Sequence, residues 1–433
     1  MRFFAFLLST LLASSTLWAA TGFDINDVAV LFPNDGLHKP IPYISLDEAA
    51  LIDPKILTAV LDRAAAIGIK APQTTAMAKP ADFSIRAFRI DPCAPEEHGL
   101  SSEPCLFELR LIAQPTARFS PADTTLHLIY KLGSGKPTAQ NPVLIDLQKL
   151  KIESETVSRL STNGFPLGVH PVLAASAKTK RTNIPLLFAN FVRKYARVEA
   201  LSKVTMMGLR NGSPTNWIFF GGDIIDGKWL STPVPNRKLI RSQNNFVELN
   251  VNEGAESFKG TAVDGKLSLD QFFNQTPDDV TSDLNAIAET AFTLENPDLT
   301  NRNTVDCVSC HAATSMRLAT DFVFPTEVEG VMSRVPKGIT AFPAMGTVQN
   351  HPLHWNLRAF GYFGLTPTVS LRAVHEAADS AEQINTILGL TAPGSDCSAV
   401  YKDVLQCFVT GTLEPWTVNG ETNCLAKCER IIR

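Results

Sequence analysis

The sequence predicts a multidomain α+β protein, in which a mostly antiparallel β-rich domain precedes a helical domain and a small disulfide-linked C-terminal segment. Strand-like alternation of apolar and polar residues dominates residues 100–255, and apolar residues recur at helical spacing from 276 to 389. Four of the eight cysteines lie after residue 392. We expect a signal peptide over 1–19 and domains over 20–265 and 266–392, followed by a cysteine-rich segment over 393–433.

The first nineteen residues are typical of a secretory signal. Arg2 precedes the apolar stretch Phe3–Leu12, and the small residues Ala19 and Ala20 offer a cleavage site. The apolar stretch is too short to span a bilayer, although a buried N-terminal helix is the alternative interpretation. We therefore expect an exported protein, in the periplasm or at the surface of a Gram-negative bacterium, that is not an integral membrane protein.

The β-rich domain follows from local patterns. Asp53-Pro54 predicts a helix start, with Asp as the N-cap and Pro in the first turn. Alternation predicts half-buried strands over 107–111 and 126–132. A helix is expected around 185–200, and a meander of strands follows it, with turns at Asn211-Gly212 and Asp226-Gly227. These strands predict a sandwich, or a sheet with helices on one side.

The helical domain begins after a glycine-containing linker at 252–266. Thr276-Pro277 predicts the start of one helix, and Thr366-Pro367 predicts the start of another that ends at Gly389.

Between these helices lies Cys307-Val308-Ser309-Cys310-His311, which has the spacing of a covalent haem attachment site. Two thiols three residues apart can reach the two vinyl groups of one porphyrin, and the next residue can turn its imidazole under the iron. The motif therefore predicts one haem c, bound covalently by Cys307 and Cys310, with His311 as the proximal iron ligand.

Three other interpretations compete with haem. A thioredoxin-like redox pair would require a surrounding βαβ unit, which the sequence does not predict here. A zinc site would require a second ligand pair, which His351 and His354 could supply. A structural disulfide between Cys307 and Cys310 would close a strained ring.

The segment from about 270 to 390 resembles the c-type cytochromes through this motif and its flanking helices. In that family, a loop containing Pro-x-Met usually supplies the sixth iron ligand, and the resemblance implies this role for Met345 in Phe342-Pro343-Ala344-Met345. His351 and His354 are the alternatives to Met345. Weaker candidates are Met316, Met332 and His375, and Arg358 is either a partner for a haem propionate or a solvated residue.

The remaining six cysteines predict disulfides, because an exported chain meets an oxidising compartment. Cys93 and Cys105 flank a short loop and are expected to pair. Cys397 and Cys407 would lie roughly 15 Å apart on a helix, at ~1.5 Å per residue, which exceeds disulfide reach. Pairing Cys397 with Cys428 and Cys407 with Cys424 is favoured, and the parallel pairing remains open.

These patterns favour an electron-transfer protein with a redox protein partner. The alternatives are a haem enzyme of peroxidase-like or ligand-binding type with an open sixth site, or an envelope binding module that carries a haem domain. The formal net charge of −4 gives no support for a nucleic-acid partner, which would require clustered basic residues. The isolated residues His98, His127 and His170 are expected to be structural or exposed.

Overall fold

The computed structural model describes most of the chain between residues 22 and 391. The described ranges are 22–35, 39–47, 51–69, 80–95, 105–116, 124–163, 165–179, 183–211, 216–235, 240–244, 255–257, 290–291, 293–297, 299–314, 357–364 and 366–391. Within those ranges, no helix is both long enough and apolar enough to cross a bilayer.

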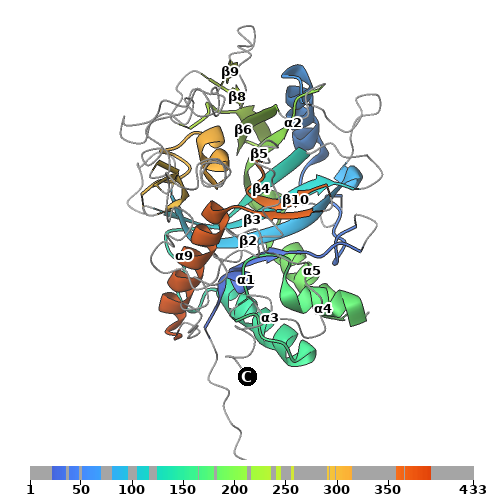
Figure 1. Cartoon of the computed structure of the whole chain (residues 1–433), viewed down its shortest axis with the longest axis vertical. Coiled ribbons are helices and arrows are strands. Elements are labelled where there is room, and N and C mark those ends of the chain that lie inside the picture. The colour runs from blue at the N-terminus through green and yellow to red at the C-terminus, as the bar shows by residue number, and fades with distance from the viewer. Residues whose placement is uncertain are drawn as a thin grey trace, which may run out of the picture.

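One large sheet dominates the described residues (Figure 1). Eight of its nine strands follow the order β1-β2-β3-β4-β5-β6-β8-β9, and β7 also pairs with β6. All pairings are antiparallel except that of β8 with β9. The strands are β1 (Ala29–Leu31), β2 (Phe83–Pro95), β3 (Cys105–Pro115), β4 (Thr124–Ser134), β5 (Leu201–Leu209), β6 (Trp217–Ile225), β7 (Lys228–Ser231), β8 (Ser242–Asn244) and β9 (Ala255–Ser257).

Helices and a separate hairpin pack around this sheet. The helices are α1 (Ile25–Val28), α2 (Pro54–Ala66), α3 (Pro142–Ser158), α4 (Pro171–Thr179), α5 (Asn183–Tyr195) and α9 (Leu371–Leu388), with 3₁₀ turns at Pro80–Asp82 and Val198–Ala200. The hairpin consists of β10 (Phe360–Phe363) and β11 (Thr366–Val369). The fold is therefore α+β with a mainly antiparallel sheet, as the sequence predicts.

Several local predictions are confirmed. Asp53 caps α2 by accepting a hydrogen bond from the amide of Lys55, and Pro54 occupies the first turn. Asp226 and Gly227 both adopt positive φ, which is the conformation that the β6–β7 turn requires. Cys93 at the end of β2 and Cys105 at the start of β3 form the predicted disulfide.

Other predictions require correction. Thr366 and Pro367 belong to β11, so the following helix begins only at Leu371, where Ser370 caps it. The helix expected around 185–200 ends at Tyr195. The main described strands form one sheet rather than a sandwich. Successive side chains of a strand point to opposite faces, and on β2 Phe88 contacts α5 whereas Arg89 contacts α9, so helices lie on both faces.

The two faces of the sheet contact different elements. Phe88, Met206 and Phe220 belong to the main core, and Phe88 stacks on Phe191 of α5 with ring centres 5.6 Å apart. Their strand neighbours Met207 and Phe219 belong to a second apolar cluster. Its other members include Ala291, Leu294, Val305, Val308, Ala312, Ala313 and Leu357. Figure 1 shows α3, α4 and α5 grouped below the sheet, with α9 to their left. The second face is the one on which the segment 307–311 packs, since Val308 belongs to this cluster.

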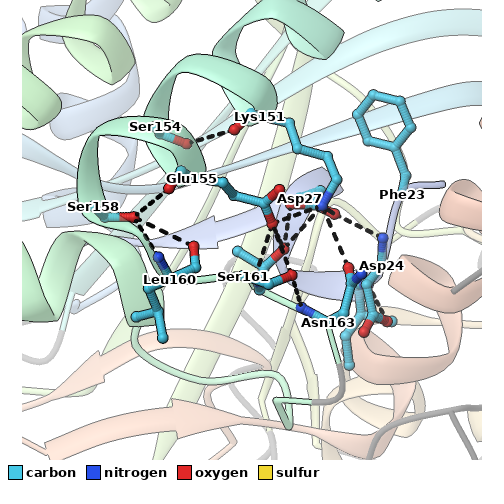
Figure 2. Close-up of polar contacts among 12 residues, drawn as sticks. Phe23, Asp24, Asp27, Lys151, Ser154, Glu155, Ser158, Leu160, Ser161 and Asn163 are labelled. Carbon is cyan, nitrogen blue, oxygen red and sulfur yellow. Dashed lines mark hydrogen bonds and ion pairs between the residues drawn. The ribbon is translucent and has the colours of Figure 1, made fainter. Parts of the chain in front are cut away.

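A buried ionic cluster joins α1 to α3 (Figure 2). The Lys151 ammonium donates to Asp27 and Glu155, each at 2.9 Å. Thr162 donates to the second oxygen of Asp27 at 2.6 Å, and Asn163 accepts a further bond from Lys151. Burial raises the pKa of Asp27, although Lys151 opposes that rise. The cluster therefore depends on Lys151 to neutralise a carboxylate that has no access to water.

Candidate functional site

The motif Cys307-Val308-Ser309-Cys310-His311 begins a helical segment over 307–314. Positions 307, 310 and 311 lie on one side of a helix, because residues three and four apart are neighbours. Their side chains are half-buried, whereas Val308, Ser309 and Ala312 are fully buried against the sheet. The helix therefore presents both thiols and the imidazole together and uses its opposite face for packing.

Asp306 and Gln243 fix this short helix at its start. The Asp306 carboxylate accepts hydrogen bonds from the amide and hydroxyl of Ser309, at 3.0 and 2.9 Å. Gln243 of β8 donates to Asp306 at 2.7 Å and accepts from the amide of Val308 at 3.2 Å. Because these bonds satisfy amides that the first helical turn leaves unpaired, they hold the motif in one orientation on the sheet.

The His311 ring has a defined orientation. Its Nδ1 lies 2.7 Å from the carbonyl oxygen of Leu357, so Nδ1 carries the proton and donates to that oxygen. The Nε2 atom then retains its lone pair, and a backbone carbonyl in this position makes the imidazole a stronger metal ligand. Burial lowers the pKa of His311 to about 4, so the ring is neutral near pH 7.

The motif side chains open into a cavity of about 680 Å³ between the helical segment, the sheet and α9. That volume lies within the ~300–1,000 Å³ range of cofactor and ligand sites. Its apolar walls include Ile112, Ile129, Met207, Phe219, Val305 and Phe360. The cavity can therefore hold a large, mostly apolar ring beside Cys307, Cys310 and His311.

A second imidazole lies across the cavity from the motif. His127 belongs to the interior strand β4, directly opposite Ile112 of β3 and Thr205 of β5. The centres of the His127 and His311 rings are 6.2 Å apart and their planes differ by 24°. Burial lowers the pKa of His127 to about 3, so this ring is also neutral near pH 7. The sequence predicts that His127 is structural or exposed. In the structure it lines the cavity of the candidate site.

Four arginines and three carboxylates form a network beside the motif. Arg302 makes a bidentate pair with Glu108, with both N–O distances 2.9 Å, and Arg110 binds Glu108 and Asp91. Glu376 of α9 accepts from Arg89 and Arg372. The arginines all reach the cavity wall, where this network has an excess of one positive charge. Such a wall suits a ligand that carries carboxylates at its edge.

Glu108 is expected to make a pH-dependent contribution to stability. Although burial raises the pKa of Glu108, Arg110 and Arg302 outweigh it and hold the pKa below its ordinary value. A lowered folded pKa means that the stabilisation is present above the unfolded value of about 4.3 and is lost as the pH falls through the folded value. Glu108→Gln should therefore lower the free energy of unfolding by about 2 kcal/mol at pH 7.

Urea denaturation of both proteins at pH 7 and at pH 3.5 measures this effect. The difference between Glu108→Gln and the unmodified chain should shrink at the lower pH. An equal difference at both values would show that the two arginines do not stabilise the ionised form of Glu108.

Two of the weaker sequence candidates have other roles. His375 is buried in α9, its Nδ1 lies 2.7 Å from the Glu295 carbonyl oxygen, and it does not line the cavity. Arg358 is also buried, which rules out the solvated interpretation, and its guanidinium lies 5.5 Å from the centre of the Trp217 ring. His170 is structural, since its Nδ1 accepts from the Leu173 amide at 3.4 Å.

Other predicted residues lie outside the described ranges. They are the signal peptide, His98, Met316, Met332, Met345, His351, His354, Cys397, Cys407, Cys424 and Cys428. The zinc interpretation depends on His351 and His354. Within the described ranges, no group of three or more His, Cys, Asp or Glu residues is arranged to hold a metal ion.

The structure adds site residues that local sequence patterns do not indicate. Gln243 lies on β8, His127 lies on β4 and Leu357 precedes β10, so these residues reach the motif only through the fold. The sequence offers a signal for Gln243 and His127 alone. Both are polar residues within strands, where a buried polar side chain requires a partner. Comparison with protein-family models, with curated proteins and with solved structures gives no match for this chain.

Proposed function

We propose that this chain is an exported c-type haem protein that transfers electrons to or from a protein partner. The observation that carries the proposal is the arrangement of Cys307, Cys310 and His311 on one helical face, at the wall of a cavity of about 680 Å³. The Nδ1 contact with Leu357 supports it, because that contact leaves Nε2 to face a metal.

The residues present fit a covalently bound haem. Cys307 and Cys310 are free thiols. Each would add across one vinyl group, forming a carbon–sulfur bond while the thiol hydrogen goes to the other vinyl carbon, so the addition needs no oxidant. The arginines of the cavity wall would receive the propionates. When bound, the group supplies a one-electron couple between ferric and ferrous iron.

The thiols are less suited to dithiol redox chemistry. A redox-active pair requires at least one thiolate, which a lowered pKa provides. Burial instead raises the pKa of Cys307 to about 12 and that of Cys310 to about 11. The cavity beside them is also much larger than such a pair would use. These features favour attachment of a large group over thiol–disulfide exchange.

Electron transfer is favoured over turnover of a small substrate because apolar side chains of paired interior strands form much of the cavity wall. Met207 and Phe219 lie on neighbouring interior strands, directly opposite each other, and both are almost fully buried. The sequence contains a single Cys-x-x-Cys-His motif, whereas two-haem peroxidases need two. The Cys93–Cys105 disulfide supports an oxidising compartment outside the cytoplasm.

Carbon monoxide binding tests the electron-transfer proposal. The mature chain, produced in a host that attaches haem c, should show a reversible one-electron reduction, and its reduced optical spectrum should not change when carbon monoxide is added. The physical reason is that His311 and a second protein group would both bind the iron and would leave no position for carbon monoxide. Rapid carbon monoxide binding by the unmodified protein would instead support the enzyme or ligand-binding alternative.

A further inference from the structure

We infer that His127 is the second axial ligand of the haem iron, so that the iron is held between the imidazoles of His127 and His311. This inference rests on the proposed function and specifies its sixth ligand. It replaces Met345, which the cytochrome resemblance implies, with a residue from the β-rich part of the chain.

The separation of the two rings carries the inference. Two imidazoles that bind one metal ion from opposite sides, through bonds of about 2.0 Å, have ring centres roughly 6 Å apart. The centres of the His127 and His311 rings are 6.2 Å apart, and the planes are inclined by only 24°. Both rings line the same cavity. This separation would suit one iron ion bound by a nitrogen of each ring.

The position of His127 on its strand supports a ligand role. Strand β4 pairs with β3 on one side and β5 on the other, so the backbone of His127 is fixed from both sides. His127 is half-buried although it lies in the interior of the sheet, because its remaining exposed surface faces the cavity. A ligand on such a strand would need little rearrangement to keep its distance from His311.

The second ligand also explains why the motif is packed onto the sheet. Arg302 binds Glu108 of β3, Gln243 of β8 binds Asp306, and Phe219 of β6 lies 5.0 Å from the His311 ring, measured between ring centres. These contacts fix the motif helix relative to β4. The iron would therefore join two parts of the chain that are separated by more than 180 residues.

Among described residues, Met207 is the alternative that the cavity offers. It lines the cavity, and a thioether can ligate haem iron. Met207 is instead packed in the apolar cluster that contains Phe219 and Val308, where it is almost fully buried. Met345 and Met207 would both bind iron through sulfur, whereas His127 would bind through nitrogen. One spectroscopic measurement of the ligand atom therefore distinguishes either methionine from His127.

The test uses the full mature chain with its haem attached. Electron paramagnetic resonance and near-infrared magnetic circular dichroism of the unmodified ferric protein should show low-spin iron with two nitrogen ligands. A sulfur-to-iron charge-transfer band would overturn the inference and would be assigned by Met345→Ala and Met207→Leu. This measurement does not depend on whether any His127 variant folds.

His127→Gly provides the second arm of the test. The variant should keep its covalent haem, become high-spin, bind carbon monoxide when reduced, and return to low spin when imidazole is added. His170→Gln, which removes a buried histidine outside the cavity, should leave the spectrum unchanged. A His127→Gly protein that stays low-spin without imidazole would overturn the inference. Absence of haem from the unmodified protein would instead overturn the proposed function.

Discussion

The variant Cys307→Ala/Cys310→Ala is expected to lose covalent haem completely, falling from about one haem per chain to none. Both thioether bonds would be absent, and the histidine ligands by themselves could hold only a dissociable group. The measurement is the pyridine haemochrome content per chain after acid–acetone extraction, which removes haem that is not covalently bound. Each single variant should retain haem through one thioether and show a shifted absorption band, because one vinyl group remains unsaturated.

Ser309→Ala is the matched control for this prediction. Ser309 lies between the two cysteines, and its hydroxyl donates a hydrogen bond to Asp306 at 2.9 Å. Its loss should weaken the helix cap by about 1 kcal/mol and leave the haem content unchanged. Extraction-resistant haem in the double cysteine variant would contradict the assignment of these thiols.

Lys151→Met is expected to lower the free energy of unfolding by about 3–5 kcal/mol, since it leaves the buried Asp27 carboxylate and the half-buried Glu155 carboxylate without their cation. Both contacts measure 2.9 Å, and the Lys151 and Asp27 side chains are almost fully buried. Loss of the ammonium should also raise the pKa of Asp27 further. A raised carboxyl pKa favours folding at low pH, so the deficit should grow as the pH rises.

Urea denaturation at pH 5 and pH 8 measures this effect. Lys149→Met is the control, because Lys149 is on the same helix, is 64% exposed and should change stability by less than about 0.5 kcal/mol. Asp27→Asn/Lys151→Met should be less destabilised than Lys151→Met alone. A single variant no less stable than the control would contradict the importance of this cluster.

Much of the fold could be predicted from local signals. The Asp53-Pro54 helix start, the Asp226-Gly227 turn and the strands around residues 109 and 128 depend on backbone and side-chain preferences within a few residues. The start of α9 could not be predicted in the same way. Thr366-Pro367 suits the beginning of a helix, but pairing with β10 makes it a strand, and Ser370 then supplies the cap.

The candidate site likewise contains residues that a local sequence pattern predicts and residues that only the tertiary fold brings in. Cys307, Cys310 and His311 are adjacent in sequence, so their chemistry is visible in a five-residue motif. His127 and Gln243 join them only through strand pairing, and Leu357 joins through a carbonyl group that every residue has. A histidine within a strand has many structural uses, and only the distance of His127 from the His311 ring indicates that the two could bind one metal ion.

The central claim is that Cys307 and Cys310 bind haem covalently, and peptide mass mapping tests it most directly. Trypsin cleaves after Arg302 and after Arg317, so it should release residues 303–317, which contain both cysteines. From the mature protein made in a host that attaches haem c, this peptide should carry the mass of one haem, with no free thiol. Recovery of the bare peptide with both thiols open to alkylation would contradict the account.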